Sequence, residues 1–274
     1  MYFTKTSIGE SHLKNGKVCQ DFSASYHDGD RTIVTACDGH GGAIYLRSDR
    51  GARFASAAAI NVLRNVGQKT FFRRRTEEVI GQLRVQLLCE WNAMVERDLR
   101  AHPLKKRETE HLTDAQRLSL RAEPVRAYGT TVHAAMLFGN KLICFSIGDG
   151  GCFLLRKGKL IPAFPDDDDE QVANLTDSLC QEDAGERLHA GVFDAGAFDG
   201  AFLCTDGVIN PYRTMDNFTR SLAVPAVGKL FDRRDKELSD FVERLGASIG
   251  TGDDVTLSIL LNDAVKRRYY GTEV

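Results

Sequence analysis

The sequence lacks any apolar run long enough to cross a membrane. The stretch at 257–261 is typical, since it contains only four apolar residues and one serine, whereas a membrane-spanning helix needs about 20 apolar residues. The opening residues, MYFTKTSIGESHLK, also lack the apolar core of a secretory signal. We therefore expect neither insertion into a membrane nor export.

A large excess of one charge is also missing. The 36 basic and 38 acidic residues give a net charge of -2, which excludes a general attraction to nucleic acid or to acidic membranes. The seven cysteines are dispersed and form no CxxC pair, and an odd number without a framework is typical of the reducing cytoplasm. Cys37, Cys144 and Cys204 lie in apolar runs and are expected to be small buried side chains.

The composition, 42% hydrophobic and 27% charged, is that of a globular protein. No repeat and no low-complexity linker divides the chain, so we expect one domain over residues 1–274. Residue patterns predict strands at 21–26, 32–37, 130–138, 141–147, 152–156, 201–205 and 255–261. Helical spacing of apolar residues indicates helices at 52–66, 79–95 and 226–249, and the polar stretch 100–124 is predicted to be a connection with a short helix.

The strands follow one another through hairpins, which favours antiparallel sheets. Gly139-Asn140 is a hairpin signal, and a second turn is expected around Gly158. Alternating strands and crossover helices, as in a parallel sheet, are not seen. The fold class is therefore predicted to be α+β, with helices covering two packed, mostly antiparallel sheets.

Four aspartates occur where predicted strands meet loops. Asp38, Asp149 and Asp206 each follow an apolar run and precede glycine, in TACDGHGG, FSIGDGG and FLCTDGV, and Asp253 precedes the last strand in GTGDDVTLSILL. A carboxylate at a strand end has a rigid base, and a neighbouring glycine lets a ligand approach the main chain. Carboxylates are preferred ligands of Mg²⁺ and Mn²⁺, so their convergence would form a site for divalent cations.

The same motifs carry a resemblance to a known family. The sequence is similar to the metal-dependent protein phosphatases of type 2C over nearly its whole length, and most to a bacterial branch, as GESHLKNGKVCQD indicates. The matching segments, in the family's order, are Asp38-Gly39-His40-Gly41-Gly42, Tyr128-Gly129-Thr130-Thr131, Gly148-Asp149-Gly150, Thr205-Asp206-Gly207 and Asp253-Asp254-Val255-Thr256.

The resemblance implies a four-layer αββα sandwich that hydrolyses phosphoserine and phosphothreonine in proteins with two Mn²⁺ or Mg²⁺ ions. Asp38 would bridge the two ions, the Gly39 carbonyl would bind one of them, and Asp206 and Asp253 would complete the first site. Asp21 would support the second site through water, and Asp149 would face a weaker third ion. His40 would protonate the leaving oxygen. The implied partner is a phosphorylated protein, and whether a cognate Ser/Thr kinase acts opposite this enzyme stays open.

Two positions depart from the family pattern. Gln20 precedes Asp21 where the family usually has glutamate, so we expect a weaker second metal site and a lower metal requirement in a Gln20→Glu variant. Gly16 stands where the family usually has a phosphate-binding arginine. Lys14 and Lys17 are nearby candidates for phosphate binding, but lysine lacks the bidentate fork of arginine.

Two other functions compete with the phosphatase hypothesis. Gln20 and the missing arginine would also suit a weak or inactive relative that regulates a partner by docking. A metal-dependent nuclease would use clustered carboxylates too, but no strong basic stripe is visible. The acidic run 166–170 lacks the spacing of a calcium-binding EF-hand loop, and the basic run 73–75 is expected to be a surface feature at a helix start.

Overall fold

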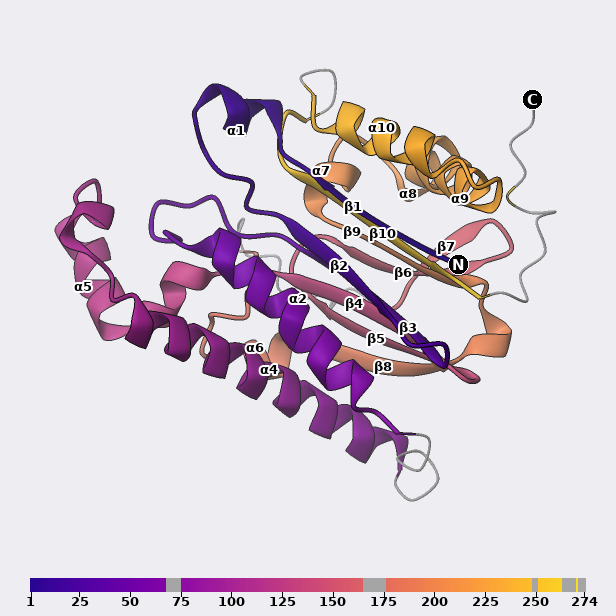
Figure 1. Cartoon of the computed structure of the whole chain (residues 1–274), viewed down its shortest axis with the longest axis horizontal. Helices are drawn as coiled ribbons and strands as arrows, with labels where there is room; N and C mark the ends of the chain where they lie inside the picture. The colour runs from indigo at the N-terminus through magenta and orange to yellow at the C-terminus, as the bar shows by residue number, and fades with distance from the viewer. Residues whose placement is uncertain (68–74, 165–175, 248–250, 263–269, 271–274) are drawn as a thin grey trace.

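The protein is built from two five-stranded antiparallel sheets with helices on their outer faces (Figure 1). The computed structural model describes residues 1–67, 75–164, 176–247, 251–262 and 270. Outside these residues lie the acidic run 166–170 and residues 73 and 74 of the basic run. Arg75, the last residue of the basic run, is the N-cap of α4. Within the described part of the chain, no helix is both long and apolar enough to cross a bilayer.

The first sheet has the strand order β2-β3-β4-β5-β8. Its strands are β2 (Phe22–His27), β3 (Arg31–Cys37), β4 (Val132–Phe138), β5 (Lys141–Ile147) and β8 (His189–Asp194). Helices α2 (Ser48–Arg64) and α4 (Thr76–Ala101) cover its outer face (Figure 1). The buried face of α2 is rich in alanine, and the indole of Trp91 on α4 donates to the Gly51 carbonyl over 3.1 Å, so the two helices pack closely.

The second sheet has the strand order β1-β10-β9-β6-β7. Its strands are β1 (Tyr2–Ser7), β10 (Val255–Leu261), β9 (Gly200–Cys204), β6 (Gly151–Arg156) and β7 (Lys159–Pro162). Helices α9 (Val224–Phe231) and α10 (Asp235–Leu245) cover its outer face (Figure 1). The remaining elements are α1 (Glu10–Lys14), η1 (Lys106–Glu108), α5 (Asp114–Ala122), η2 (Pro124–Tyr128), α6 (Ala184–Arg187), η3 (Ala195–Ala197), α7 (Asp206–Ile209), α8 (Met215–Phe218) and η4 (Thr219–Ala223).

A layer of small and branched apolar side chains joins the sheets. Val34 and Ala135 meet Cys144, Leu203 and Leu260 there, and all five are buried. The buried positions of Cys144 and Cys204, and also of Cys37, confirm the expectation for these residues, and all seven cysteines are free thiols. Separate cores under each pair of helices complete an αββα sandwich, which confirms the predicted fold class.

Most predicted elements are present, and 141–147 and 255–261 match their strands. The hairpin glycine Gly139 has φ +56°, and Lys157 and Gly158 have φ 51° and 73°, as a tight two-residue turn requires. The single helix predicted over 226–249 is wrong, because the chain forms α9 and α10 instead. Arg233 between them has φ 59°, a left-handed conformation that ends the first helix.

Three strands were not predicted. β7 is a four-residue edge strand, β8 contains a glycine, and β1 is an edge strand with one buried residue, Phe3. Edge strands lack the strong apolar pattern of central strands, because few of their residues are fully buried.

Candidate active site

The five aspartates that were predicted as metal ligands lie at one end of the sandwich. The registers Phe22↔Cys37, Val132↔Ile147 and Leu257↔Cys204 place the start of β2, β4 and β10 beside the end of β3, β5 and β9. Asp38, Asp149 and Asp206 follow the latter strands, and Asp21 and Asp253 precede β2 and β10. Antiparallel pairing therefore brings segments from the whole chain to one end.

Asp38, Asp149 and Asp206 form a compact acidic trio. Each offers a carboxylate oxygen, and these oxygens all lie within 4.8 Å of one another. Burial, together with the charges of Asp21, Asp206, Asp149 and Asp253, raises the pKa of Asp38 well above its usual value. Burial and neighbouring carboxylates also raise the pKa of Asp206.

The trio has no cationic partner among the described lysine and arginine side chains. Its recorded donors outside the trio are neutral: the Thr176 hydroxyl donates to Asp149 over 2.6 Å, and the Asn210 amide donates to Asp206 over 3.0 Å. Clustered hard oxygen ligands with uncompensated negative charge fit a divalent cation.

The Asp38–Gly42 segment, here called the DGHGG loop, is held by the Tyr128–Thr131 motif. The Asp38 N–H donates to the Thr131 hydroxyl over 2.9 Å, and the Asp38 carbonyl accepts from Thr131 N–H and the Thr130 hydroxyl. A side chain at Gly39 would come within 2.7 Å of the Gln20 and Ser48 carbonyl oxygens. The loop therefore needs glycine beside Asp38.

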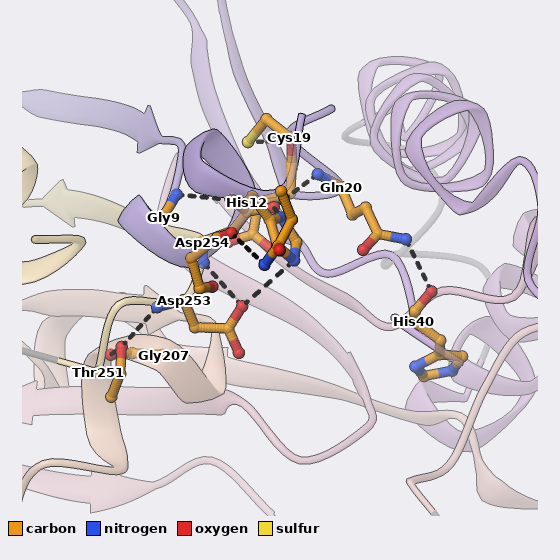
Figure 2. A network of polar contacts seen from close by, with 12 residues as sticks. Gly9, His12, Cys19, Gln20, His40, Gly207, Thr251, Asp253 and Asp254 are labelled. Carbon is orange, nitrogen blue, oxygen red and sulfur yellow. Dashed lines mark hydrogen bonds and ion pairs between the residues drawn. The ribbon is translucent and has the colours of Figure 1, made fainter. Parts of the chain in front are cut away.

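Two of the predicted ligands stand apart from the trio. Asp21 is buried, and its carboxylate accepts from the Thr205 hydroxyl over 2.8 Å. Burial is the main cause that raises the pKa of Asp21 to about 8. Asp253 is exposed, and its carboxylate accepts from the Asp254 N–H over 2.9 Å (Figure 2). Asp253 is close enough that its charge raises the pKa of both Asp38 and Asp206.

His40 lies beside a cleft at the edge of this acidic end. Its ring packs 4.8 Å from the Tyr45 ring, centroid to centroid, and its buried Nε2 has no hydrogen-bond partner among the described residues. Burial lowers the pKa of His40, while the charge of Asp149 acts in the opposite direction. The cleft has a volume of about 590 Å³, and its lining includes His40, Tyr45 and Arg126.

The positions that depart from the family pattern have specific contacts. The Gln20 amide nitrogen donates to the His40 carbonyl over 2.9 Å and to the Ser48 hydroxyl over 2.6 Å. Lys14 pairs with Glu10 on α1 over 2.7 Å, and Lys17 is exposed in the loop that follows. The lining of the cleft beside His40 contains neither lysine.

Arg126 is a residue that sequence reasoning missed. It lies in η2 and donates to the Ser119 hydroxyl over 3.0 Å. Its position three residues before Gly129 could have drawn attention, because the Tyr128–Thr131 motif packs against the DGHGG loop. A lone arginine in a polar stretch carries no stronger signal.

Solved structures with the same fold include several bacterial phosphatases. A bacterial serine phosphatase is 14% identical, with 95% of this chain and 97% of that chain covered and a TM-score of 0.61. The catalytic domain of the serine/threonine phosphatase PstP, in complex with two manganese ions, is 18% identical, with coverages of 94% and 96% and a TM-score of 0.55. Stp1 from Staphylococcus aureus is 10% identical, with coverages of 96% and 95% and a TM-score of 0.54. At these identities the likeness establishes the fold.

A family model establishes the class. The model described as protein phosphatase 2C matches residues 8–243, which is most of the chain, while no curated protein sequence matches. The chain belongs to the protein phosphatase 2C family. It is accordingly a serine/threonine phosphoprotein phosphatase, and the finding supports a catalytic role over the binding-module and nuclease alternatives.

Proposed function

We propose that this phosphatase acts with two divalent cations held at the acidic end of the sandwich. The observation that carries the proposal is the uncompensated charge of the acidic trio. Asp38 would bridge the ions, with the Gly39 carbonyl, Asp206 and Asp253 as further ligands of the first. Mn²⁺ is the expected ion, with Mg²⁺ as the alternative, because Mg²⁺ demands a more ideal octahedral geometry.

The two remaining carboxylates take outer roles in this proposal. Asp21 is buried and accepts a hydrogen bond from the Thr205 hydroxyl, which suits a residue that orients water at the second ion. Asp149 is exposed and shares the trio with Asp206, which suits a weaker third ion. When bound, two such ions would lower the pKa of water between them and neutralise the substrate phosphate.

His40 is the proposed general acid for the serine or threonine leaving group. Its Nε2 is buried and has no hydrogen-bond partner among the described residues, so a substrate that reaches this atom would satisfy a polar group that the fold leaves unpaired. Burial disfavours the protonated ring, whereas the negative charge of a bound phosphate would favour it. Substrate binding would thus supply the proton where it is needed.

Recognition of the phosphate and the peptide is assigned to Arg126 in the cleft beside His40 and to two lysines that do not line this cleft. Arg126 lines the cleft beside His40 and offers a planar cation to an anionic substrate. Lys14 and Lys17 remain proposed phosphate contacts on the N-terminal segment. The substrate would be a phosphoprotein, and a cognate kinase in a cytoplasmic signalling pair would fit the free thiols and the family. Residues 1–274 would act as one such domain.

A direct assay tests the proposal. Protein stripped of metal with EDTA is assayed for phosphate release from a phosphothreonine peptide, first alone and then with added Mn²⁺ or Mg²⁺. We expect no release without metal, and release that depends on Mn²⁺ concentration. Release that persists in EDTA would refute the metal requirement, and a protein inactive with every divalent cation would refute catalysis.

A further inference from the structure

Asp254 is a buried carboxylate that the proposed mechanism does not use. It is 4% exposed, and both of its carboxylate oxygens accept hydrogen bonds. The Gly9 N–H donates to one oxygen over 2.7 Å, while the Gln20 N–H and the His12 ring donate to the other over 2.6 and 2.9 Å (Figure 2). Because a carboxylate only accepts, His12 must carry its proton on Nδ1.

His12 lies between two adjacent carboxylates. Its Nδ1 bonds Asp254, and its Nε2 is 3.9 Å from the Asp253 carboxylate (Figure 2). The backbone around it is also fixed, because the Ser11 N–H donates to the Gly252 carbonyl over 2.8 Å. A side chain at Gly9 would come within 2.3 Å of the Asp253 backbone, so α1 begins in direct contact with this loop.

Gln20 continues the connection to the other sheet. Its N–H binds Asp254, its carbonyl accepts from the Gly39 N–H over 3.1 Å, and its amide group donates to the His40 carbonyl. The contacts therefore run from the loop before β10, through Asp254 and Gln20, to the DGHGG loop after β3 (Figure 2). These two loops carry proposed metal ligands from opposite sheets.

We propose that the His12–Asp254 pair is a positioning device of the metal site, which holds the loop that carries Asp253 on one side and, through Gln20, the Asp38–His40 segment on the other. The inference rests on the proposed metal-dependent function. Groups behind metal ligands set the orientation of those ligands, and their loss weakens metal binding by about 10–100-fold.

Mn²⁺ titration by calorimetry, without substrate, tests the device. We compare the wild type with His12→Ala and His12→Asn, because an asparagine amide can replace Nδ1 as the donor to Asp254. The matched control is His27→Ala, since His27 is an exposed histidine whose ring hydrogen-bonds to Arg31 and Thr32 and packs against the Tyr2 ring, none of which is a proposed metal ligand. We expect His12→Ala to weaken Mn²⁺ binding by about 10–100-fold, His12→Asn to restore most of the affinity, and His27→Ala to match the wild type.

Each outcome of these titrations supports or overturns the positioning role of the pair. A purely structural role would lower the folded fraction, and hence the binding stoichiometry, with an unchanged dissociation constant, which would overturn the proposal. A His12→Asn variant as weak as His12→Ala would overturn it too. If His12→Ala does not fold, the nearly isosteric Asp254→Asn decides instead, and a wild-type dissociation constant there would overturn the proposal. A wild-type protein that binds no Mn²⁺ would instead refute the proposed function itself.

Discussion

Two groups of carboxylates lie at the same end of the sandwich and differ in how their charge is balanced. Asp254 accepts hydrogen bonds from Gly9, Gln20 and His12. In the acidic trio, Asp38 instead faces other carboxylates, and burial together with their repulsion raises its pKa. The negative charge of Asp254 is therefore balanced by donors of the protein itself, whereas the trio needs a bound cation to balance its charge.

The largest effect is expected in the trio. Asp38→Asn or Asp206→Asn should reduce turnover by orders of magnitude, because each removes an anionic metal ligand. Both changes should also raise the melting temperature of the metal-free protein, since they relieve repulsion. Thermal melts in EDTA and turnover with Mn²⁺ measure the two effects. Near-normal activity in either variant would end the two-metal hypothesis.

Asp254→Asn is the matched control for this comparison. An asparagine amide has one oxygen that accepts and one NH2 group that only donates. The backbone N–H that faces the NH2 group, of Gly9 or of Gln20, would therefore lose its acceptor. Such a loss costs about 1–3 kcal/mol. The metal-free variant should therefore melt below the wild type, opposite to Asp38→Asn. Shifts of the same sign in both variants would remove the distinction between the two groups.

The second effect concerns His40, beside the trio. His40→Ala should reduce turnover of a phosphothreonine peptide by roughly 10²–10⁴-fold, because the alkoxide leaving group needs a proton. An activated aryl phosphate needs little protonation and should lose much less. Steady-state kinetics on both substrates measure the ratio. Equal losses would assign His40 a structural role.

The third prediction uses the buried carboxyl of Asp21. Its pKa is raised from 3.8 to about 8, mainly by burial. Between these values the folded state holds a proton that the unfolded state has released, so this group's contribution to stability falls as pH rises. In EDTA, Asp21→Asn should therefore gain stability relative to the wild type from pH 5 to pH 8. Denaturant unfolding at both pH values measures the difference, and a constant difference would contradict it.

The smallest effect concerns Gln20, where the sequence and the structure predict opposite signs. The sequence predicts that Gln20→Glu lowers the Mn²⁺ concentration for half-maximal activity. In the structure the amide donates to the His40 carbonyl and the Ser48 hydroxyl, and glutamate would lose donation to the carbonyl. One lost hydrogen bond, at about 1 kcal/mol, would raise the midpoint roughly fivefold. A lowered midpoint would place Gln20 at the second metal after all.

Local sequence patterns were enough to locate most strands and the aspartates beside their ends. Alternation and hairpin glycines are local signals, so 141–147, 255–261 and the turn at Gly139 could be located without any tertiary information. The Asp-Gly motifs at strand ends indicated the acidic end of the sandwich for the same reason. The helix over 226–249 failed because a break at Arg233 depends on a single backbone conformation.

Which carboxylate has hydrogen-bond partners could not be predicted from the sequence and became clear from the folded chain. Asp254 and Gly9 are 245 positions apart in the chain, and no local sequence pattern near either residue predicts their hydrogen bond. The same holds for Gln20, whose amide meets the His40 carbonyl, and for Arg126 beside the cleft. Local sequence fixes backbone geometry, whereas the balance of buried charge depends on donors that the folded chain brings together from distant segments.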